Sequence, residues 1–176
     1  LVIDNASTDT TVAIIQSSFP TARLISLKQN IGHSAACNLA LQIADTGWVL
    51  FLDHDTTVPQ GWLEPLLELA ENMWPHTAMV SSRAILITPG QEPRIHHDGG
   101  HAHYVGHMTL RNGFAALKGA DKPDIAEVGA QAATSLLVHR ERAIEVGGFD
   151  ARFFIYLNDF ELSLRMRMRG WRCYIE

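Results

Sequence analysis

The sequence predicts an α/β protein in which a mostly parallel sheet is flanked by helices. Three observations lead to this class: strand-like and helix-like segments alternate through the first half, their connections are short, and polar clusters follow the strands. The 176 residues are 47% hydrophobic, which suffices for one sizeable core, so we expect a single domain. From residue 88 onward, the sequence predicts a region rich in loops and hairpins before regular structure resumes.

The first half contains three predicted strands, each followed by a predicted helix. Turn and capping residues in DNASTD begin the first helix, Pro20 ends it, and Ser34 is the expected N-cap of the second. We expect the three strands to be parallel neighbours, so that Asp4 and Asp53 face one pocket at the carboxyl edge of the sheet, where ligands bind. The expected strands cover residues 1–4, 22–27 and 48–52, and the later helices cover about 34–44 and 61–74.

The second half begins with one further strand, at residues 78–87, and then changes character. Residues 89–123 are rich in glycine and histidine and lack a helical period, which predicts hairpins and loops. A strand at 134–140 and a short helix precede the GGFD turn, whose glycines indicate positive φ. The segment NDFELSLRMRMRGW predicts a helix with Asp159 in its first turn, and WRCYIE predicts a last strand.

Composition limits the partners and the compartment. The net charge of −5 argues against general attraction to nucleic acid. Cys37 and Cys173 are too isolated for a disulfide framework, which favours a reducing compartment. No apolar run is long enough to span a bilayer, so we expect a cytoplasmic protein. Four arginines near the end leave two alternatives, a solvated helix face or contact with phosphate or an anionic membrane surface: Arg165, Arg167, Arg169 and Arg172.

Two carboxylates follow the apolar run VLFL at its carboxyl end. Alternation along an extended chain places Asp53 and Asp55 on the same side, where like charges repel unless a cation or a shared proton lies between them. Mg²⁺ and Mn²⁺ prefer such oxygen ligands and keep positions open for water and phosphates. The segment therefore predicts a metal site, with a capped turn as the alternative. His54 points to the opposite side, and we expect it to be structural.

Four sequence blocks, taken in order, resemble a known family. They are VIDNASTD, NIGHSAACNLAL, LFLDHD and GGFDARFFIYLNDFELSLRMRMRGW. In these blocks the chain resembles family 2 glycosyltransferases, which are nucleotide-sugar enzymes of the GT-A fold. The resemblance implies one catalytic domain over residues 1–176, with a nucleotide-sugar-binding half at 1–87 and an acceptor-binding half at 88–176. Such enzymes have an additional first strand, so we expect the chain to be a fragment that is cut at both ends.

The resemblance also implies the residues of the site. Asp4 would hydrogen-bond the nucleotide base, with Asn5 beside it. Asp53 would face the ribose and share with Asp55 the binding of Mg²⁺ or Mn²⁺. Asp159 would be the catalytic base. The other matched positions near the nucleotide are Asn30, Gly32 and Asn38.

The implied reaction is the metal-dependent, inverting transfer of a sugar from a nucleoside-diphosphate sugar to an acceptor hydroxyl. The acceptor would be a saccharide or a lipid-linked saccharide in the assembly of surface polysaccharide or glycolipid, and rhamnose is the sugar that the resemblance suggests. Two locations remain open for the protein: the cytoplasm away from the membrane, or peripheral association with the inner face of the membrane.

The chain departs from the family pattern at two positions, and other functions compete. Cys37 stands where the family often has arginine, and Asn158 replaces a glutamate before the base. These departures motivate a non-catalytic nucleotide-sugar-binding domain as one alternative. The segment DHDTT motivates another, a haloacid dehalogenase-like phosphatase, in which Asp53 would be the nucleophile, Asp55 the acid and base, and Thr57 a phosphate contact.

The histidines of the chain raise a further question. For the five between residues 96 and 107, three interpretations remain open: a metal site, contacts with the acceptor, or ordinary loop surface. His33, at the start of the second expected helix, leaves two alternatives, a phosphate contact or packing at the helix start. The five loop histidines are His96, His97, His101, His103 and His107.

Overall fold

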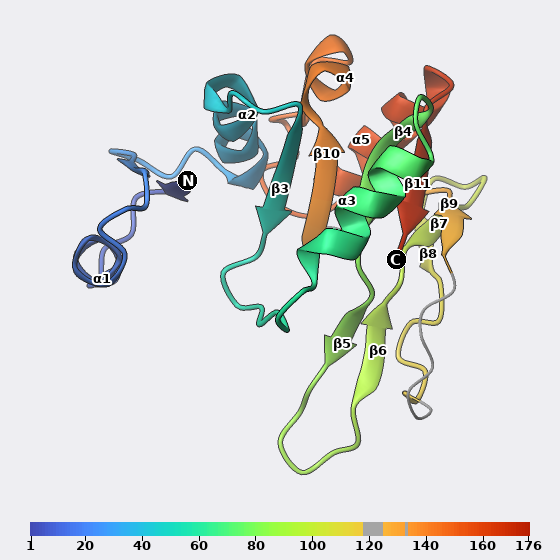
Figure 1. Cartoon of the computed structure of the whole chain (residues 1–176), viewed down its shortest axis with the longest axis horizontal. Helices are drawn as coiled ribbons and strands as arrows, with labels where there is room; N and C mark the ends of the chain where they lie inside the picture. Colours follow the sequence, from blue (N-terminus) through green and yellow to red (C-terminus); the bar gives the residue numbers. More distant parts are fainter. Residues whose placement is uncertain (118–124, 133) are drawn as a thin grey trace.

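The computed structural model of the chain describes residues 1–117, 125–132 and 134–176 (Figure 1). The helices are α1 (Thr11–Ser18), α2 (His33–Ile43), α3 (Leu63–Asn72), α4 (Arg140–Glu145) and α5 (Asn158–Met168). The strands are β1 (Val2–Asp4), β2 (Leu24–Ser26), β3 (Trp48–Leu52), β4 (Thr77–Ser81), β5 (Ala84–Leu86), β6 (Arg94–His97), β7 (Gly100–Ala102), β8 (Met108–Leu110), β9 (Ala126–Val128), β10 (Ser135–His139) and β11 (Arg172–Ile175). The predicted helices at 34–44 and 61–74 are confirmed as α2 and α3, and the predicted last helix as α5.

The central sheet has the strand order β3-β10-β4-β11-β9. β10 runs antiparallel to both β3 and β4, β11 runs parallel to β4, and β9 runs antiparallel to β11. The α/β class with a sheet flanked by helices is therefore confirmed, but the central sheet is mixed rather than mostly parallel. The reason is that β10, which follows the long hairpin region, inserts between two strands of the first half.

The predicted pairing of the first three strands was wrong in part. β1 and β2 pair in parallel, with Asp4 opposite Ser26, and form a two-stranded sheet of their own. β3 instead pairs along its full length with β10, from Trp48 opposite His139 to Leu52 opposite Ser135. Within the described residues, β3 shares no ladder with β1. Asp4 and Asp53 thus come from separate sheets.

The two faces of the central sheet carry separate apolar cores. On one face, α2, α4 and α5 pack against alternate residues of β10 and β4, including Leu136 and Met79. On the other face, α3 packs against the intervening residues, such as Leu137 and Val80. Figure 1 shows α3 in front of the sheet and α5 behind it. Successive side chains of a strand point to opposite faces of the sheet. Because both faces of β4 are covered, every one of its residues is buried.

The region after β4 forms hairpins, as predicted. The strand expected at 78–87 divides into β4 and β5, and β5 pairs with β6 while β7 pairs with β8. In Figure 1, the β5–β6 hairpin extends below the sheet. Residues 118–124 of the expected loop region lie outside the described residues. No helix in the described part of the chain has the length and apolar character needed to cross a membrane.

Candidate functional site

The end of β1 is bonded to the loop that precedes α2. The Asn5 side chain accepts a hydrogen bond from the Ile31 backbone N–H at 2.9 Å and donates to Asn30 Oδ1 at 3.0 Å. Asn30 Oδ1 also accepts from the Gly32 N–H at 2.9 Å. Asp4 is buried and accepts from the Ser7 N–H at 3.0 Å. The predicted nucleotide-binding positions Asp4, Asn5, Asn30 and Gly32 therefore form one connected group. We call it the nucleotide corner because of the ligand predicted there.

The two carboxylates after β3 lie on a tight turn. The Asp53 carbonyl accepts hydrogen bonds from the backbone N–H of Thr56 at 3.2 Å and from its hydroxyl at 2.6 Å. The Asp53 N–H donates to the Thr134 carbonyl at 3.0 Å, which ties the turn to the start of β10. The Asp53 side chain is half-buried, while Asp55 and His54 are exposed. We call Asp53 to Asp55 the metal turn because of the site predicted there.

The electrostatics of the metal turn connect it to residues from two helices. Burial raises the pKa of Asp53, and the Asp55 and Asp159 carboxylates raise it further, while His33 and His54 lower it. These influences decay with distance, so His33 at the start of α2 and Asp159 at the start of α5 both lie near the metal turn. A cation bound to Asp53 and Asp55 would relieve the repulsion that Asp53 experiences from the other carboxylates.

Asp159 lies in the first turn of α5, as predicted. Its Oδ1 accepts a hydrogen bond from the Phe160 N–H at 2.8 Å, and its side chain is half-buried. The two residues that lead into the helix, Tyr156 and Leu157, are left-handed with φ of 67° and 57°. Such residues cost about 1–2 kcal/mol each, and strained backbone of this kind clusters at functional sites.

α2 holds the whole segment that leads to Asp159. The Asn38 side chain donates to the Phe149 carbonyl and accepts from its N–H, both at 2.7 Å. The Ser34 hydroxyl donates to the Phe153 carbonyl, and the His33 N–H donates to the Phe154 carbonyl at 2.7 Å. Asn38 therefore fixes the turn that precedes α5, and its predicted contact with the nucleotide stays a prediction.

The two departures from the family pattern lie close together. Cys37 is buried, and burial, followed by the Asp53 and Asp159 carboxylates, raises the pKa of its thiol to about 12. The side chain is therefore neutral and supplies no cation. The Asn158 amide nitrogen lies 2.9 Å from His33 Nδ1, and the Cys37 sulfur lies 3.7 Å from both ring nitrogens of His33.

Sequence reasoning missed this contact between His33 and Asn158. The spacing of His33 and Cys37, four residues apart on one helix face, was the only available signal, and it points to Cys37 rather than to Asn158. The structure answers the open question about His33 in part, because the ring is packed and bonded at the helix start.

The donor set of the metal turn suits a hard divalent cation. Asp53 and Asp55 supply carboxylate oxygens, which Mg²⁺ and Mn²⁺ prefer. Within the described residues, no group of three or more His, Cys, Asp or Glu side chains is arranged to hold a metal ion. A cation at this turn would therefore complete its coordination with phosphate oxygens and water, which is usual for Mg²⁺ bound with a nucleotide.

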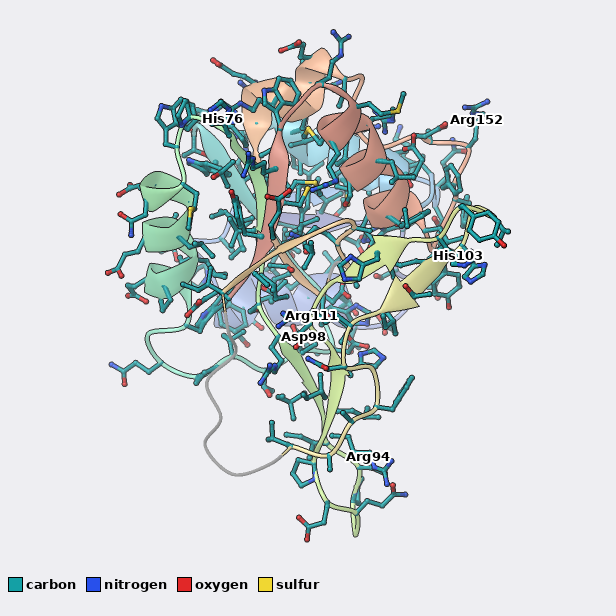
Figure 2. All side chains as sticks on the ribbon, turned by 90° about the vertical axis from the view of Figure 1, so that its right-hand side faces the viewer. His76, Arg94, Asp98, His103, Arg111 and Arg152 are labelled. Atoms are coloured by element: carbon teal, nitrogen blue, oxygen red, sulfur yellow. The ribbon has the colours of Figure 1, made fainter. Side chains whose placement is uncertain are left out.

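The loop histidines do not form a metal-binding group in the described residues. His103 stacks on His107 with ring centroids 4.7 Å apart, and His97 is buried with its Nε2 2.6 Å from the Thr134 hydroxyl. Figure 2 shows His103 on its hairpin, well away from Asp98. The metal alternative for these histidines is therefore wrong there, and acceptor contact or loop surface remains.

Asp98 organises the root of the hairpin region. It is fully buried, and its Oδ2 accepts hydrogen bonds from Arg83 at 3.0 Å and from Asn112 at 2.9 Å. Arg111 approaches the same oxygen at 3.9 Å, and Figure 2 shows the Asp98 and Arg111 side chains together. This charge cluster joins the segments that directly follow β4, β6 and β8.

The four C-terminal arginines pair with acidic residues. Arg165 forms an ion pair with Glu161 at 2.5 Å and donates to two carbonyls of the GGFD region. Arg167 and Arg172 both contact Glu127, and Arg169 lies 4.0 Å from Glu145. These contacts favour a structural helix face over a site for phosphate or membrane.

A family model described as "Glycosyl transferase family 2" matches residues 1–132. The match covers three quarters of the chain and includes the whole of the nucleotide corner and the metal turn. The chain belongs to this family. The match includes the DHDTT segment, which favours the glycosyltransferase interpretation of Asp53, Asp55 and Thr57 over the phosphatase alternative.

Among curated proteins, the chain is 28% identical over 190 aligned residues to an N-acetylglucosaminyl-diphospho-decaprenol L-rhamnosyltransferase of Mycobacterium tuberculosis, found in two strains. The alignment covers 97% of this chain and 61% of the relative. The chain thus spans about three fifths of the length of the curated relatives that it matches.

Solved structures of the same fold include GalNAc-T7 with UDP, GalNAc and Mn²⁺, at a TM-score of 0.72 and 18% identity, covering 98% of this chain and 35% of that one. A mannosyltransferase from Pyrobaculum calidifontis, in complex with GDP-Man and Mn²⁺, superposes with a TM-score of 0.62 at 18% identity, covering 99% and 46% of the two chains. These likenesses confirm the predicted GT-A fold.

Proposed function

We propose that this chain carries the catalytic site of an inverting, metal-dependent glycosyltransferase, which transfers a sugar from a nucleoside-diphosphate sugar to an acceptor hydroxyl. Family membership supports sugar transfer as the reaction class. The bound nucleotides and Mn²⁺ of the two structural neighbours support a nucleotide-sugar donor and a divalent cation. Which cation the protein uses, Mg²⁺ or Mn²⁺, belongs to the same proposal.

One observation carries this proposal: Asp159 lies near the metal turn. The two elements are more than 100 residues apart in the sequence, yet α2 connects them: its His33 contacts Asn158, beside Asp159, and its Asn38 holds Phe149 against Phe51 of β3. The Asp159 carboxylate is also near enough to raise the pKa of Asp53. A transferase that inverts in a single displacement requires this arrangement, because a base for the acceptor must stand near the group that holds the donor phosphates.

Each carboxylate has its own task in the proposed reaction. Asp159 accepts the proton of the acceptor hydroxyl as its oxygen attacks the anomeric carbon. Asp53 and Asp55 hold the cation, which when bound offsets the negative charge that develops on the leaving nucleoside diphosphate. Asp4 and Asn5, at the corner fixed by Asn30, contact the base of the nucleotide. Because attack comes from the face opposite the leaving group, the anomeric configuration is inverted.

The relative suggests the substrates. The mycobacterial protein is named for transfer of L-rhamnose to N-acetylglucosaminyl-diphospho-decaprenol. We propose a rhamnosyl donor and a lipid-linked saccharide acceptor for this chain as well. Residues 88–176, with the hairpins and α5, would form the acceptor side, and residues 1–87 the nucleotide side. An acceptor of this kind would bring the protein to the inner face of the membrane.

The experiment that tests this function is a screen of nucleotide sugars against the full-length protein. Release of nucleoside diphosphate is measured with Mn²⁺, with Mg²⁺ and with a chelator. We expect release from one donor, dependent on the cation and stimulated by a lipid-linked acceptor. Metal-dependent binding without any release or transfer would instead favour the non-catalytic nucleotide-sugar-binding domain.

A further inference from the structure

His33 lies at the centre of the candidate site, and the proposed mechanism gives it no task. Its backbone N–H donates to the Phe154 carbonyl at 2.7 Å, and its Nδ1 lies 2.9 Å from the amide nitrogen of Asn158. The Cys37 sulfur lies 3.7 Å from each of its ring nitrogens. The backbone contact fixes the position of the residue, and the contacts with Asn158 and Cys37 hold the imidazole in one orientation.

The contact with Asn158 selects the tautomer of the ring. An amide nitrogen can only donate, so Nδ1 accepts and the neutral imidazole carries its proton on Nε2. Asn158 is only 4% exposed, so water does not compete strongly for this bond. A glutamate at position 158 would instead accept a hydrogen bond from Nδ1–H, and the neutral ring would then carry no proton on Nε2. The asparagine thus makes Nε2 a hydrogen-bond donor.

The ring also lies where donor phosphates are expected. His33 begins α2, whose Asn38 is bonded to the Phe149 backbone, and the Phe149 ring contacts Phe51 of β3 with ring centroids 5.3 Å apart. β3 leads directly into the metal turn. His33 directly follows Gly32, whose N–H is bonded to Asn30 in the nucleotide corner. The imidazole therefore lies between the nucleotide corner and the start of α5, on the helix that is linked through Phe149 to the strand before the metal turn.

We propose that His33 binds the diphosphate of the nucleotide-sugar donor through Nε2–H, and that Asn158 is the residue that positions it. This inference rests on the proposed function, because it assigns a residue to the donor of that reaction. Nε2–H would donate a hydrogen bond to a phosphate oxygen, and this bond would strengthen as the leaving group gains negative charge. No proton needs to move. Asn158, which replaces the family's glutamate, acts through His33 and not on the substrate.

The test is calorimetric titration of the full-length protein with uridine, guanosine and thymidine diphosphates in the presence of Mn²⁺. His33→Phe keeps a ring against Cys37 but removes the donor, and we expect it to weaken binding of the accepted nucleotide about 10- to 100-fold. His33→Gln restores an N–H near the position of Nε2 and should recover part of the affinity. His76→Phe removes an exposed imidazole outside the candidate site and should leave the affinity unchanged.

A double-mutant cycle separates positioning from a merely structural role. Asn158→Leu should weaken nucleotide binding, but the double variant with His33→Phe should bind no worse than His33→Phe alone, because Asn158 acts through the ring. Melting temperatures show which variants fold, and His33→Ala replaces His33→Phe if the latter does not.

The outcomes for the two proposals differ. If the wild-type protein binds none of the nucleotides with Mn²⁺, the proposed function and this inference fail together. If the wild type binds and both His33→Phe and His33→Ala bind equally well, only the inference is overturned. Additive losses in the double-mutant cycle would contradict the positioning role of Asn158.

Discussion

Asp159 has two chemical properties that a single substitution can separate. Its place in the first turn of α5 suits a carboxylate that stabilises the helix end, and its nearness to the metal turn suits a catalytic base. Asp159→Asn keeps a hydrogen-bonding oxygen but cannot accept the proton. We expect sugar transfer to fall by about 10²- to 10⁴-fold.

The same variant should bind nucleoside diphosphate with Mn²⁺ as the wild type does, and its thermal stability should be nearly unchanged. Initial rates of transfer, nucleotide titrations and melting curves together make the measurement. Transfer at near the wild-type rate would leave Asp159 with a role at the helix end only.

His97 gives the protein a specific sensitivity to acid. Burial, followed by the nearby His96, lowers its pKa from 6.5 to about 4, and its Nε2 is engaged with the Thr134 hydroxyl. Below pH 6.5 the unfolded chain binds a proton at this residue while the folded protein does not, so stability falls as the pH drops toward 4. The shift corresponds to about 3 kcal/mol.

The expected result is that His97→Gln abolishes this part of the acid sensitivity. Urea titrations at pH 7, 5.5 and 4 give the free energy of unfolding of both proteins. As the pH falls, this free energy should decrease by up to about 3 kcal/mol more for the wild type than for the variant. His76→Gln alters an exposed histidine and serves as the control. Parallel curves for His97→Gln and the wild type would contradict a buried neutral imidazole.

At the scale of elements, α2 organises the candidate site. Its first turn contacts the loop before α5, and Asn38 in its middle holds the GGFD turn through two backbone hydrogen bonds. The turn allows this approach because Gly148 has no side chain. A Cβ there would lie 2.3 Å from Asn38 Oδ1, whereas a Cβ on Gly147 would meet nothing within 4 Å.

These adjacent glycines provide a matched pair of variants. Gly147 and Gly148 both have positive φ, at 95° and 71°, so alanine at either position costs about 1–2 kcal/mol. Gly148→Ala must also displace the Asn38 amide, which adds about 1–3 kcal/mol. We expect denaturant unfolding to show a larger loss of unfolding free energy for Gly148→Ala than for Gly147→Ala. Equal losses would contradict the close packing of the Asn38 amide against Gly148.

The sequence predicted the elements better than their partners. Apolar periodicity and turn residues located α2, α3, β10 and α5, because these signals are local. The contact of Asn158 with His33 joins residues 125 positions apart and left no local signal. The parallel pairing of β3 with its predecessors was wrong for the same reason, since strand alternation does not identify the neighbouring strand.

At the scale of the whole molecule, the two halves meet at the metal turn. The Asp53 N–H donates to the Thr134 carbonyl, and the Thr134 hydroxyl contacts His97, so the backbone and side chain of one residue join the metal turn to the hairpin region. The resemblance predicted the fold, while its assignment of residues to the nucleotide stays a prediction. It did not predict this connection, because residues 89–134 have no regular pattern from which contacts could be inferred.

The central claim is that the metal turn binds a divalent cation and a nucleoside diphosphate together. Asp55 is exposed on this turn, so Asp55→Ala should remove a metal ligand without disturbing the fold. Asp45→Ala, which alters another exposed aspartate, is the matched control.

The measurement is calorimetric titration of the nucleoside diphosphate with and without Mn²⁺ for these three proteins. The account predicts that Mn²⁺ strengthens binding to the wild type and to Asp45→Ala, and that Asp55→Ala abolishes this metal-dependent gain while its melting temperature stays the same. An Asp55→Ala protein that binds the nucleotide with an unchanged gain from Mn²⁺ would contradict the account.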